Sequence, residues 1–237
     1  MDGRKKHGVW TLSARPVGGI GTMKTLVIET STAACSVALI QSTISGDTVI
    51  ASAHEVVGRG HAERLIPMIA ELPDGGRANR ILVDCGPGSF TGVRVGIAAA
   101  RGLAFGWGAQ VHGFSALSLI AVATFAVRPL LDSLAVVLEG GHGEVFMQTF
   151  EANPFRPAGP FASLRPEAAL ATLSGRAAVG NGIRHLATLA TDLDLTDQLP
   201  DAASAILLTG EFIALPARPI YGRAPDAKPA ASKIIAA

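Results

Sequence analysis

The chain has 237 residues, of which 49% are hydrophobic and 16% charged, and its formal net charge is +1. This length suffices for one large domain or two small ones with a buried core. The sequence has no run of about 18 uncharged apolar residues, which disfavours a transmembrane helix. The near-neutral charge disfavours a protein whose main task is to bind nucleic acid.

Cys35 and Cys85 make up the whole cysteine content of the chain. They do not form a C-x-x-C motif, so the sequence predicts neither a zinc ribbon nor a redox pair. Free thiols are typical of a reduced compartment, and we expect the protein to be cytoplasmic.

Residues 1–22 differ from the rest because they are basic and have no apolar periodicity. They also lack the apolar core of a signal peptide. We expect this extension to be disordered and the folded body to begin at Met23.

The folded body opens with three expected strands, at 26–29, 35–40 and 48–57. Each is apolar or β-branched and is bounded by turn residues. An amphipathic helix is expected at 62–72, because its apolar residues recur at helical spacing. Pro67 lies inside this range and predicts a kink or a later start.

Strands and helices alternate after that point. The sequence predicts a buried strand at 80–84, a helix at 93–108 and a short strand at 109–113. Another helix is expected at 115–127, with Ser115 as its N-cap. This alternation indicates an α/β fold.

A short internal repeat indicates that the fold is duplicated. An apolar strand ends in Glu29 and leads through a turn into a second strand, and the same pattern recurs around Glu139. A repeat on this scale is typical of two related halves. We therefore expect an N-terminal subdomain at 23–130, a C-terminal subdomain at 131–225 and a tail at 226–237.

Two further helices are expected in the second subdomain, at 165–175 and 201–214. The first has Pro166 in its first turn, where proline is tolerated. Residues from Leu215 onward are rich in proline, and we expect them to be extended.

The most distinctive stretch is a glycine-rich loop after the strand at 80–84. Its residues are Gly86, Pro87, Gly88, Ser89, Phe90, Thr91, Gly92 and Arg94. The loop has no lysine, so it is not a Walker phosphate loop. No Asp or Glu occurs between Asp84 and Asp132, which disfavours the ribose contact of a dinucleotide site.

Two interpretations of this loop stay open. Backbone N–H groups at a helix start can bind an anion, with Arg94 adding a cation. Alternatively, Ser89 or Thr91 caps the helix.

Other candidate residues are few. Glu29 and Glu139 end strands, where catalytic acids often lie, and Thr30 and Ser31 follow in a turn. The alternative is that they are solvated turn residues or a vestigial nucleotide turn. No H-x-x-x-H, H-E-x-x-H or G-x-S-x-G motif occurs, so the sequence predicts no metal site and no catalytic residue.

The sequence resembles the TsaB (YeaZ) family over nearly all of 23–229. The matching stretches, in chain order, are MKTLVIETSTAACSVALI, HAERLIPMI, GPGSFTGVRVGIAAARGLAFG, GEVFMQTF, VGNGI and PIYGRAPDAKP. The resemblance implies the ASKHA fold of actin, Hsp70 and sugar kinases, in which two α/β subdomains with mixed sheets are related by duplication.

The resemblance also implies a function. The family provides accessory proteins for the synthesis of threonylcarbamoyladenosine (t6A) at adenosine 37 of tRNAs that read codons beginning with A. Its members pair with the catalytic subunit TsaD, help to recruit the ATPase TsaE, and can form homodimers. We therefore expect a non-catalytic scaffold that meets tRNA only through the complex, with ATP or ADP at most at the partner interface.

Two departures from the family pattern bear on nucleotide binding. Glu29 stands where relatives usually have Asp, and Glu139, Gly140 and Gly141 stand where relatives often have Asp-Ala-Arg. The histidine pair by which TsaD-like proteins hold a metal has no counterpart here. The alternatives are an ATP-binding kinase or ATPase of the ASKHA superfamily, and a glycoprotease-like peptidase.

The partner interface is expected on the helices at 62–72 and 93–103. Its residues would be Ala62, Leu65, Ile66, Ile69, Val93, Gly96, Ala99, Ala100 and Leu103. Ordinary core packing is the alternative for the same residues. A face that also docks a partner is expected to expose more apolar area than a monomer normally does.

Overall fold

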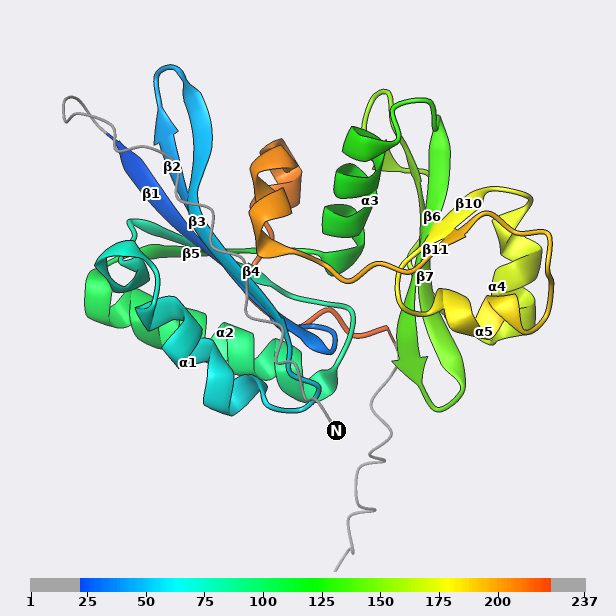
Figure 1. The fold of residues 1–237 in the computed structure, drawn as a ribbon, viewed down its shortest axis with the longest axis horizontal. Helices are drawn as coiled ribbons and strands as arrows, with labels where there is room; N and C mark the ends of the chain where they lie inside the picture. The colour runs from blue at the N-terminus through cyan, green and yellow to red at the C-terminus, as the bar shows by residue number, and fades with distance from the viewer. Residues whose placement is uncertain (1–21, 223–237) are drawn as a thin grey trace, which may run out of the picture.

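The computed structural model describes residues 22–222, which form two α/β halves side by side (Figure 1). Apart from Thr22, the extension expected at 1–22 lies outside the described residues, as does the tail expected at 226–237. Within the described residues, no helix is both long and apolar enough to cross a membrane.

The first half is built on a five-stranded sheet with the order β3-β2-β1-β4-β5. β1 pairs antiparallel with β2 and parallel with β4. Three of these strands lengthen the predicted ones by a few residues. The strands are β1 (Met23–Glu29), β2 (Ala34–Thr43), β3 (Gly46–Val56), β4 (Arg80–Asp84) and β5 (Gln110–Phe114).

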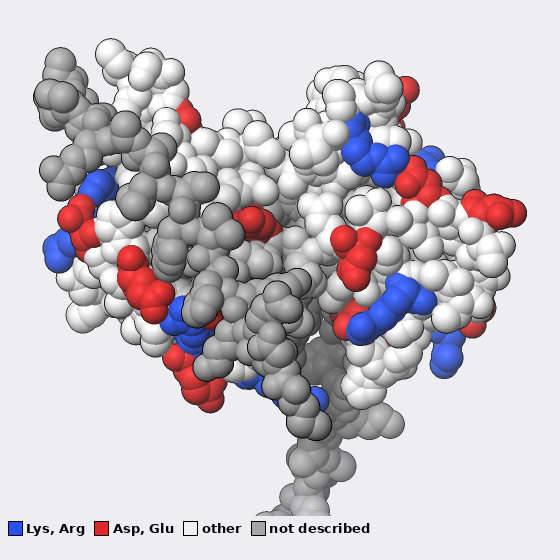
Figure 2. All heavy atoms as spheres, in the orientation of Figure 1, with Lys and Arg blue, Asp and Glu red and all other residues white. Residues whose placement is uncertain are grey.

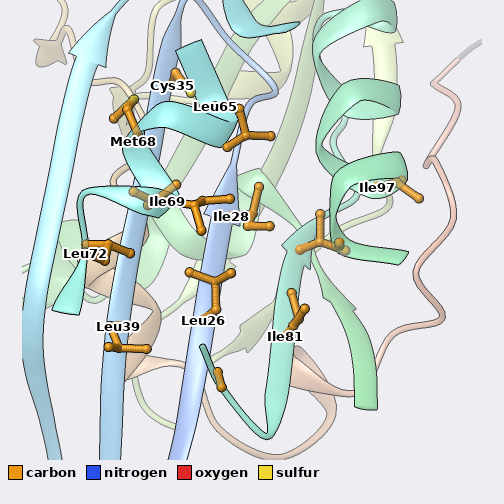
Figure 3. Close-up of a cluster of buried hydrophobic side chains, with 14 of the residues drawn as sticks. Leu26, Ile28, Cys35, Leu39, Leu65, Met68, Ile69, Leu72, Ile81 and Ile97 are labelled. Carbon is orange, nitrogen blue, oxygen red and sulfur yellow. The ribbon is translucent and has the colours of Figure 1, made fainter. Parts of the chain in front are cut away.

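Helices α1 (His61–Ala70) and α2 (Phe90–Trp107) lie together on one face of this sheet (Figure 1). Alternate residues of a strand point to opposite faces, and Leu26 and Ile28 of β1 point towards these helices (Figure 3). α1 passes Pro67 without a break in the helix.

The other face of the same sheet is covered by α3 (Ala116–Val127) and the 3-10 helix η2 (Ala202–Leu207). Val27 of β1 points into this second core. The predicted N-cap of α3 is confirmed, because Leu117 N–H donates to Ser115 Oγ at 3.3 Å.

The second half has a six-stranded sheet with α3 on one face and two helices on the other. α3 therefore packs between the two sheets and joins the halves. The main path of the sheet runs β11-β10-β6-β7-β8, and β9 pairs with β7. The elements are β6 (Ser133–Gly141), β7 (Glu144–Glu151), β8 (Arg156–Pro157), β9 (Ala162–Leu164), α4 (Pro166–Leu173), β10 (Ala177–Val179), α5 (Ile183–Ala187) and β11 (Leu195–Thr196).

The duplication suggested by the sequence is visible in the topology. The β1–β2 hairpin has β4 as a parallel neighbour, and the β6–β7 hairpin has β10 as a parallel neighbour. Glu29 and Glu139 occupy corresponding places near the ends of β1 and β6.

The segment at 201–214 differs from its expectation. Two 3-10 helices, η2 and η3 (Gly210–Ile213), replace the single predicted helix. Leu208 between them is extended, with φ −81° and ψ 136°, and Gly210 has a left-handed φ of +57°. These dihedrals are outside the α-helical range. The short elements α5, β8, β9 and β11 were also not predicted.

The chain then returns along the first half. Leu215 forms an antiparallel bridge with Gly113, and Ile220 N–H donates to the Cys85 carbonyl at 2.8 Å. Residues expected in the second subdomain therefore contact the first, and the subdomain boundaries themselves stay a prediction.

Candidate functional site at the glycine loop

The glycine loop joins the carboxyl end of β4 to the start of α2. Ser89 is the N-cap of this helix, because its Oγ accepts a hydrogen bond from Gly92 N–H at 3.2 Å. Of the two capping residues that the sequence left open, the structure therefore uses Ser89 and not Thr91.

Three glycines of this region lie against the turn between β1 and β2. Gly88, Gly92 and Gly96 are spaced by four residues, so they share one side of the loop and helix. A Cβ at Gly88 would overlap the Ser31 carbonyl, and one at Gly92 would overlap the Thr30 carbonyl. A Cβ at Gly96 would overlap Thr30 Oγ1. The glycine spacing therefore serves a close approach of α2 to this turn.

Hydrogen bonds hold the loop and the turn together. Ser89 N–H donates to the Ser31 carbonyl at 2.6 Å, and Thr30 Oγ1 donates to the Gly92 carbonyl at 2.8 Å. Glu29 and Thr30 are fully buried, and Ser31 is 1% exposed. The turn therefore offers no surface to a phosphate in this arrangement.

A pair of buried acids lies directly behind the turn. Glu29 ends β1 and Asp84 ends the neighbouring parallel strand β4. Glu29 Oε1 accepts from the N–H and the Oγ of Ser31, both at 2.6 Å, and Asp84 Oδ1 accepts from Gly86 N–H at 2.9 Å. Among the described residues, Glu29 Oε2 and Asp84 Oδ2 have no hydrogen-bond partner.

Burial shifts the titration of both acids. Loss of solvation, followed by the charge of Asp84, raises the pKa of Glu29 well above its usual range. Loss of solvation raises the pKa of Asp84 to about 6. A buried pair of like charges favours retention of a proton by one of the two acids.

Asp84 was missed by the sequence analysis. The available signal was that two predicted strands, 26–29 and 80–84, each end in an acid. If the two strands are parallel neighbours, their carboxyl ends meet at one edge of the sheet. Nothing local to either strand indicates that they are neighbours.

Glu139 has different surroundings from Glu29. Its carboxylate forms an ion pair with Arg184 and lies 3.5 Å from His185 Nε2. Its backbone N–H donates to Asn181 Oδ1 at 3.2 Å. Glu139 is partly exposed and paired with basic residues of its own half, whereas Glu29 is fully enclosed.

The two cysteines are free and buried. Burial raises the pKa of Cys35 and the pKa of Cys85 to about 12 in each case. Both thiols are therefore protonated at neutral pH and unreactive. The described residues contain no group of three His, Cys, Asp or Glu side chains placed to hold a metal ion.

The outer side of the loop carries an aromatic and cationic cluster. The Arg94 guanidinium lies 3.1 Å from the centre of the Phe90 ring and donates to Tyr221 Oη at 3.0 Å. Arg94 is therefore engaged by Phe90, the first residue of α2, and by Tyr221. Phe90 itself is 66% exposed.

The residues of the expected partner interface differ in burial, and the interface itself stays a prediction. Five of its nine residues are buried in the chain's own core and are not available to a partner: Leu65, Ile69, Val93, Gly96 and Ala100. Figure 3 shows Leu65 and Ile69 directed at the side chains of β1. Ala62 and Ile66 are exposed, and Ala99 and Leu103 are partly exposed. The helical spacing identified the apolar stripe, and that stripe faces the sheet.

The close packing of α2 is tested by Gly92→Ala. Because the new Cβ would meet a backbone carbonyl, we expect the free energy of unfolding to fall by roughly 1–3 kcal/mol. Gly102→Ala in the same helix meets nothing within 4 Å and is the matched control, with an expected gain of about 0.5–1 kcal/mol. Urea unfolding measures both. Equal stability of the two variants would contradict the packing described.

The acid pair is tested by Asp84→Asn, which keeps the Oδ1 acceptor for Gly86 N–H. A raised native pKa stabilises the folded state at low pH, and this stability is lost as the pH rises from the ordinary value of 3.8 to about 6. We expect the variant to lose part of this pH dependence and to be more stable than the wild type at pH 7 by about 1–3 kcal/mol.

Chemical denaturation from pH 4 to pH 8 provides the measurement. Asp192→Asn, at an exposed position, is the control and should keep the wild-type profile. If the Asp84→Asn variant also kept the wild-type dependence of stability on pH, this result would show that Glu29 and Asp84 do not share a proton.

Comparison with known proteins identifies relatives in bacteria. The family described as TsaD, tRNA N6-adenosine threonylcarbamoyltransferase, matches residues 47–155. The tRNA threonylcarbamoyladenosine biosynthesis protein TsaB of Escherichia coli is 34% identical over 136 residues, covering 55% of this chain and 56% of that protein. The protein of the same name from Haemophilus influenzae is 38% identical over 117 residues, or 47% and 48% of the two chains. The chain thus matches about half the length of these curated relatives.

Other relatives match over more of their length. An uncharacterised protein of Mycobacterium tuberculosis is 30% identical over 218 residues, covering 87% of this chain and 94% of that protein. The solved structure of YeaZ from Pseudomonas aeruginosa has a TM-score of 0.70 and 28% identity, covering 84% of this chain and 99% of the other. Because this structural likeness spans both halves of the fold, the chain is a protein of the TsaB/YeaZ type with an ASKHA-like fold.

Proposed function

We propose that this protein is a non-catalytic scaffold that pairs with a TsaD-like catalytic subunit in the threonylcarbamoylation of adenosine 37 of tRNA. The observation that carries the proposal is the contrast between the two sides of α2. Its inner side closes the turn at Thr30 and Ser31, and its outer side leaves small and apolar residues without a partner among the described residues.

The inner side argues against an ATPase as the main function. The resemblance implies that an ASKHA ATPase has an Asp and a glycine-rich turn after its first strand, whereas this chain has Glu29 followed by a turn without glycine. Here Thr30 and Ser31 are covered by Gly88 and Gly92, and Glu29 is turned inward beside Asp84. ATP or ADP, where it takes part, would bind at the partner interface.

The outer side of α2, together with the exposed Ile66 of α1, has the properties of a docking surface. Phe105 is 94% exposed and Ile66 is 48% exposed. A Cβ at Gly102 or at Gly106 would meet nothing within 4 Å. Glycine inside a helix costs about 1 kcal/mol relative to alanine, and the fold of the chain gains no contact from either glycine. Small residues on this surface would instead let a partner helix approach closely.

We define this docking surface as Ile66, Ala98, Gly102, Phe105 and Gly106. In our proposal it packs against the corresponding helices of a TsaD-like subunit and holds that subunit in its active geometry. The same surface would serve a homodimer of the free protein. A TsaE-like ATPase would join the resulting complex.

The charge distribution supports an indirect role towards tRNA. Figure 2 shows Lys and Arg side chains interspersed with Asp and Glu on the visible surface of the described residues, without a continuous basic area. Proteins that grip nucleic acid directly concentrate positive charge on one face. Contact with tRNA would therefore come through the complex.

Reconstitution tests the proposed function. Purified TsaC, TsaD and TsaE are given ATP, threonine, bicarbonate and unmodified tRNA, and t6A is quantified by mass spectrometry. We expect t6A only when this protein is added, and no ATP hydrolysis by this protein alone. No effect on t6A, together with ATP hydrolysis by the isolated chain, would favour the ATPase or kinase alternative.

The docking surface is tested by Phe105→Glu and Gly102→Trp. Each places a charge or a bulky side chain in the contact, so we expect the affinity for TsaD to fall at least about tenfold. Titration calorimetry measures the affinity, and circular dichroism confirms that each variant is folded.

Ile44→Glu is the matched control, because Ile44 is fully exposed and lies in the β2–β3 turn away from α2. It should bind TsaD as the wild type does. Normal binding by both Phe105→Glu and Gly102→Trp would place the interface elsewhere.

A further inference from the structure

The cations on the outer side of α2 are not balanced by an acid. Arg94 and Arg101 are both exposed, and neither forms an ion pair with a carboxylate of the described residues. α2 contains no Asp or Glu along its 18 residues. The charge that this helix presents is therefore purely positive, although the whole chain has a formal net charge of only +1.

Both arginines lie in line with the docking surface. Residues three and four positions apart share one face of a helix, and one such line along α2 consists of Phe90, Arg94, Ala98, Arg101 and Phe105. Ala98 and Phe105 belong to the docking surface, and Phe90 at the start of the line is 66% exposed. A partner that packs on the docking surface would therefore meet the two arginines as well.

A C-terminal segment holds both arginines in place. Residues 214–221, which we call the strap, run beside α2, in pale red in Figure 3. Arg101 donates to the Ala217 carbonyl of the strap at 2.6 Å. Arg94 donates to Tyr221 Oη at 3.0 Å. The strap contains no Asp or Glu, so it orders the two side chains without neutralising them, and ordering before association lowers the entropy cost of binding.

A second copy of the chain is a poor match for this surface. In a twofold dimer the same patch of each copy meets the other, and four of the five residues of the docking surface lie on α2, so the arginines of the two copies would come together. Like charges opposite each other across an interface disfavour the pairing. On the adjoining helix α1, Glu71 is paired with Arg64 at 3.0 Å, and Glu63 is exposed in the first turn.

We propose that Arg94 and Arg101 select an acidic partner over a second copy of this chain. The inference rests on the proposed function and adds the chemistry of the partner's surface. The helix of the TsaD-like subunit that packs on α2 carries Asp or Glu side chains opposite the two arginines. A guanidinium has five N–H donors, and contacts among the described residues engage one donor of each arginine. The others are free to bind those carboxylates.

The salt dependence of two equilibria tests the proposal on the unaltered chain. We expect the affinity for TsaD to fall roughly tenfold between about 0.05 M and about 0.5 M NaCl, because salt screens the attraction of opposite charges. The homodimer, in which like charges meet, should become tighter over the same range. Fluorescence anisotropy with labelled TsaD measures the first equilibrium, and analytical ultracentrifugation measures the second. An affinity for TsaD that does not fall with salt would overturn the proposal.

The double variant Arg94→Gln/Arg101→Gln removes both charges and keeps an amide donor at each position. We expect it to bind TsaD about tenfold more weakly and to self-associate about threefold more strongly than the wild type. Arg165→Gln, at an exposed position just before α4, is the matched control and should change neither equilibrium. Unchanged affinity of the double variant for TsaD, or self-association that is unchanged or weaker, would overturn the proposal.

The double variant Arg94→Lys/Arg101→Lys separates charge from the support of the strap. Lysine keeps the positive charge but not the planar guanidinium, so we expect most of the affinity for TsaD to be retained. Thermal unfolding shows whether each variant is folded. Equal losses of affinity in the Lys and Gln double variants would show that the arginines act by holding the strap, which would overturn the role of their charge.

Two further results have distinct meanings. Glu63→Gln should leave the homodimer unchanged, and a weaker homodimer would show that the arginines meet an acid of a second copy, which would overturn the proposal. A wild-type chain that binds no TsaD at any salt concentration would overturn the proposed function itself. Normal binding of TsaD that is insensitive to both arginines would overturn only the selection of an acidic partner.

Discussion

The close approach of α2 to the β1–β2 turn is the contact on which the rest of the site depends. It requires residues without a Cβ at Gly88, Gly92 and Gly96, because backbone and side-chain atoms of Thr30 and Ser31 occupy the space that a Cβ would take. Once the helix is seated there, Glu29 and the turn are sealed from solvent. The glycine loop, whose sequence looks like that of a phosphate loop, thereby packs α2 against the end of β1.

This packing also explains the unusual pair of acids. β1 and β4 are parallel neighbours, so their terminal carboxylates are brought together at one edge of the sheet. The closed turn removes the water that would solvate them, which raises the pKa of both. The arrangement seen here is therefore the physical basis for proposing a scaffold instead of an enzyme.

Strong local patterns predicted much of the fold. Apolar and β-branched runs bounded by turn residues identified β1 to β3, and Ser115 marked the start of α3. The region at 201–214 was mispredicted because an apolar, alanine-rich composition favours a helix, whereas the observed 3-10 turns pack η2 onto the sheet of the first half. The partner interface stays a prediction, because burial within the chain is known and the contact with a partner is not. Apolar spacing on α1 and α2 identifies the stripe that packs on the sheet, and it does not indicate which outward-facing residues contact a partner.

Glycine spacing, strand-end acids and the duplicated hairpin could all be recognised in the amino-acid sequence, because each reflects the conformational preferences of a few neighbouring residues. The meeting of Glu29 with Asp84 and of Ser36 with Asp201 could not. These residues are 55 and 165 positions apart, and their proximity follows from strand order and from the return of the chain onto the first sheet. Burial and the pKa shifts both arise from such distant contacts, which no local pattern encodes.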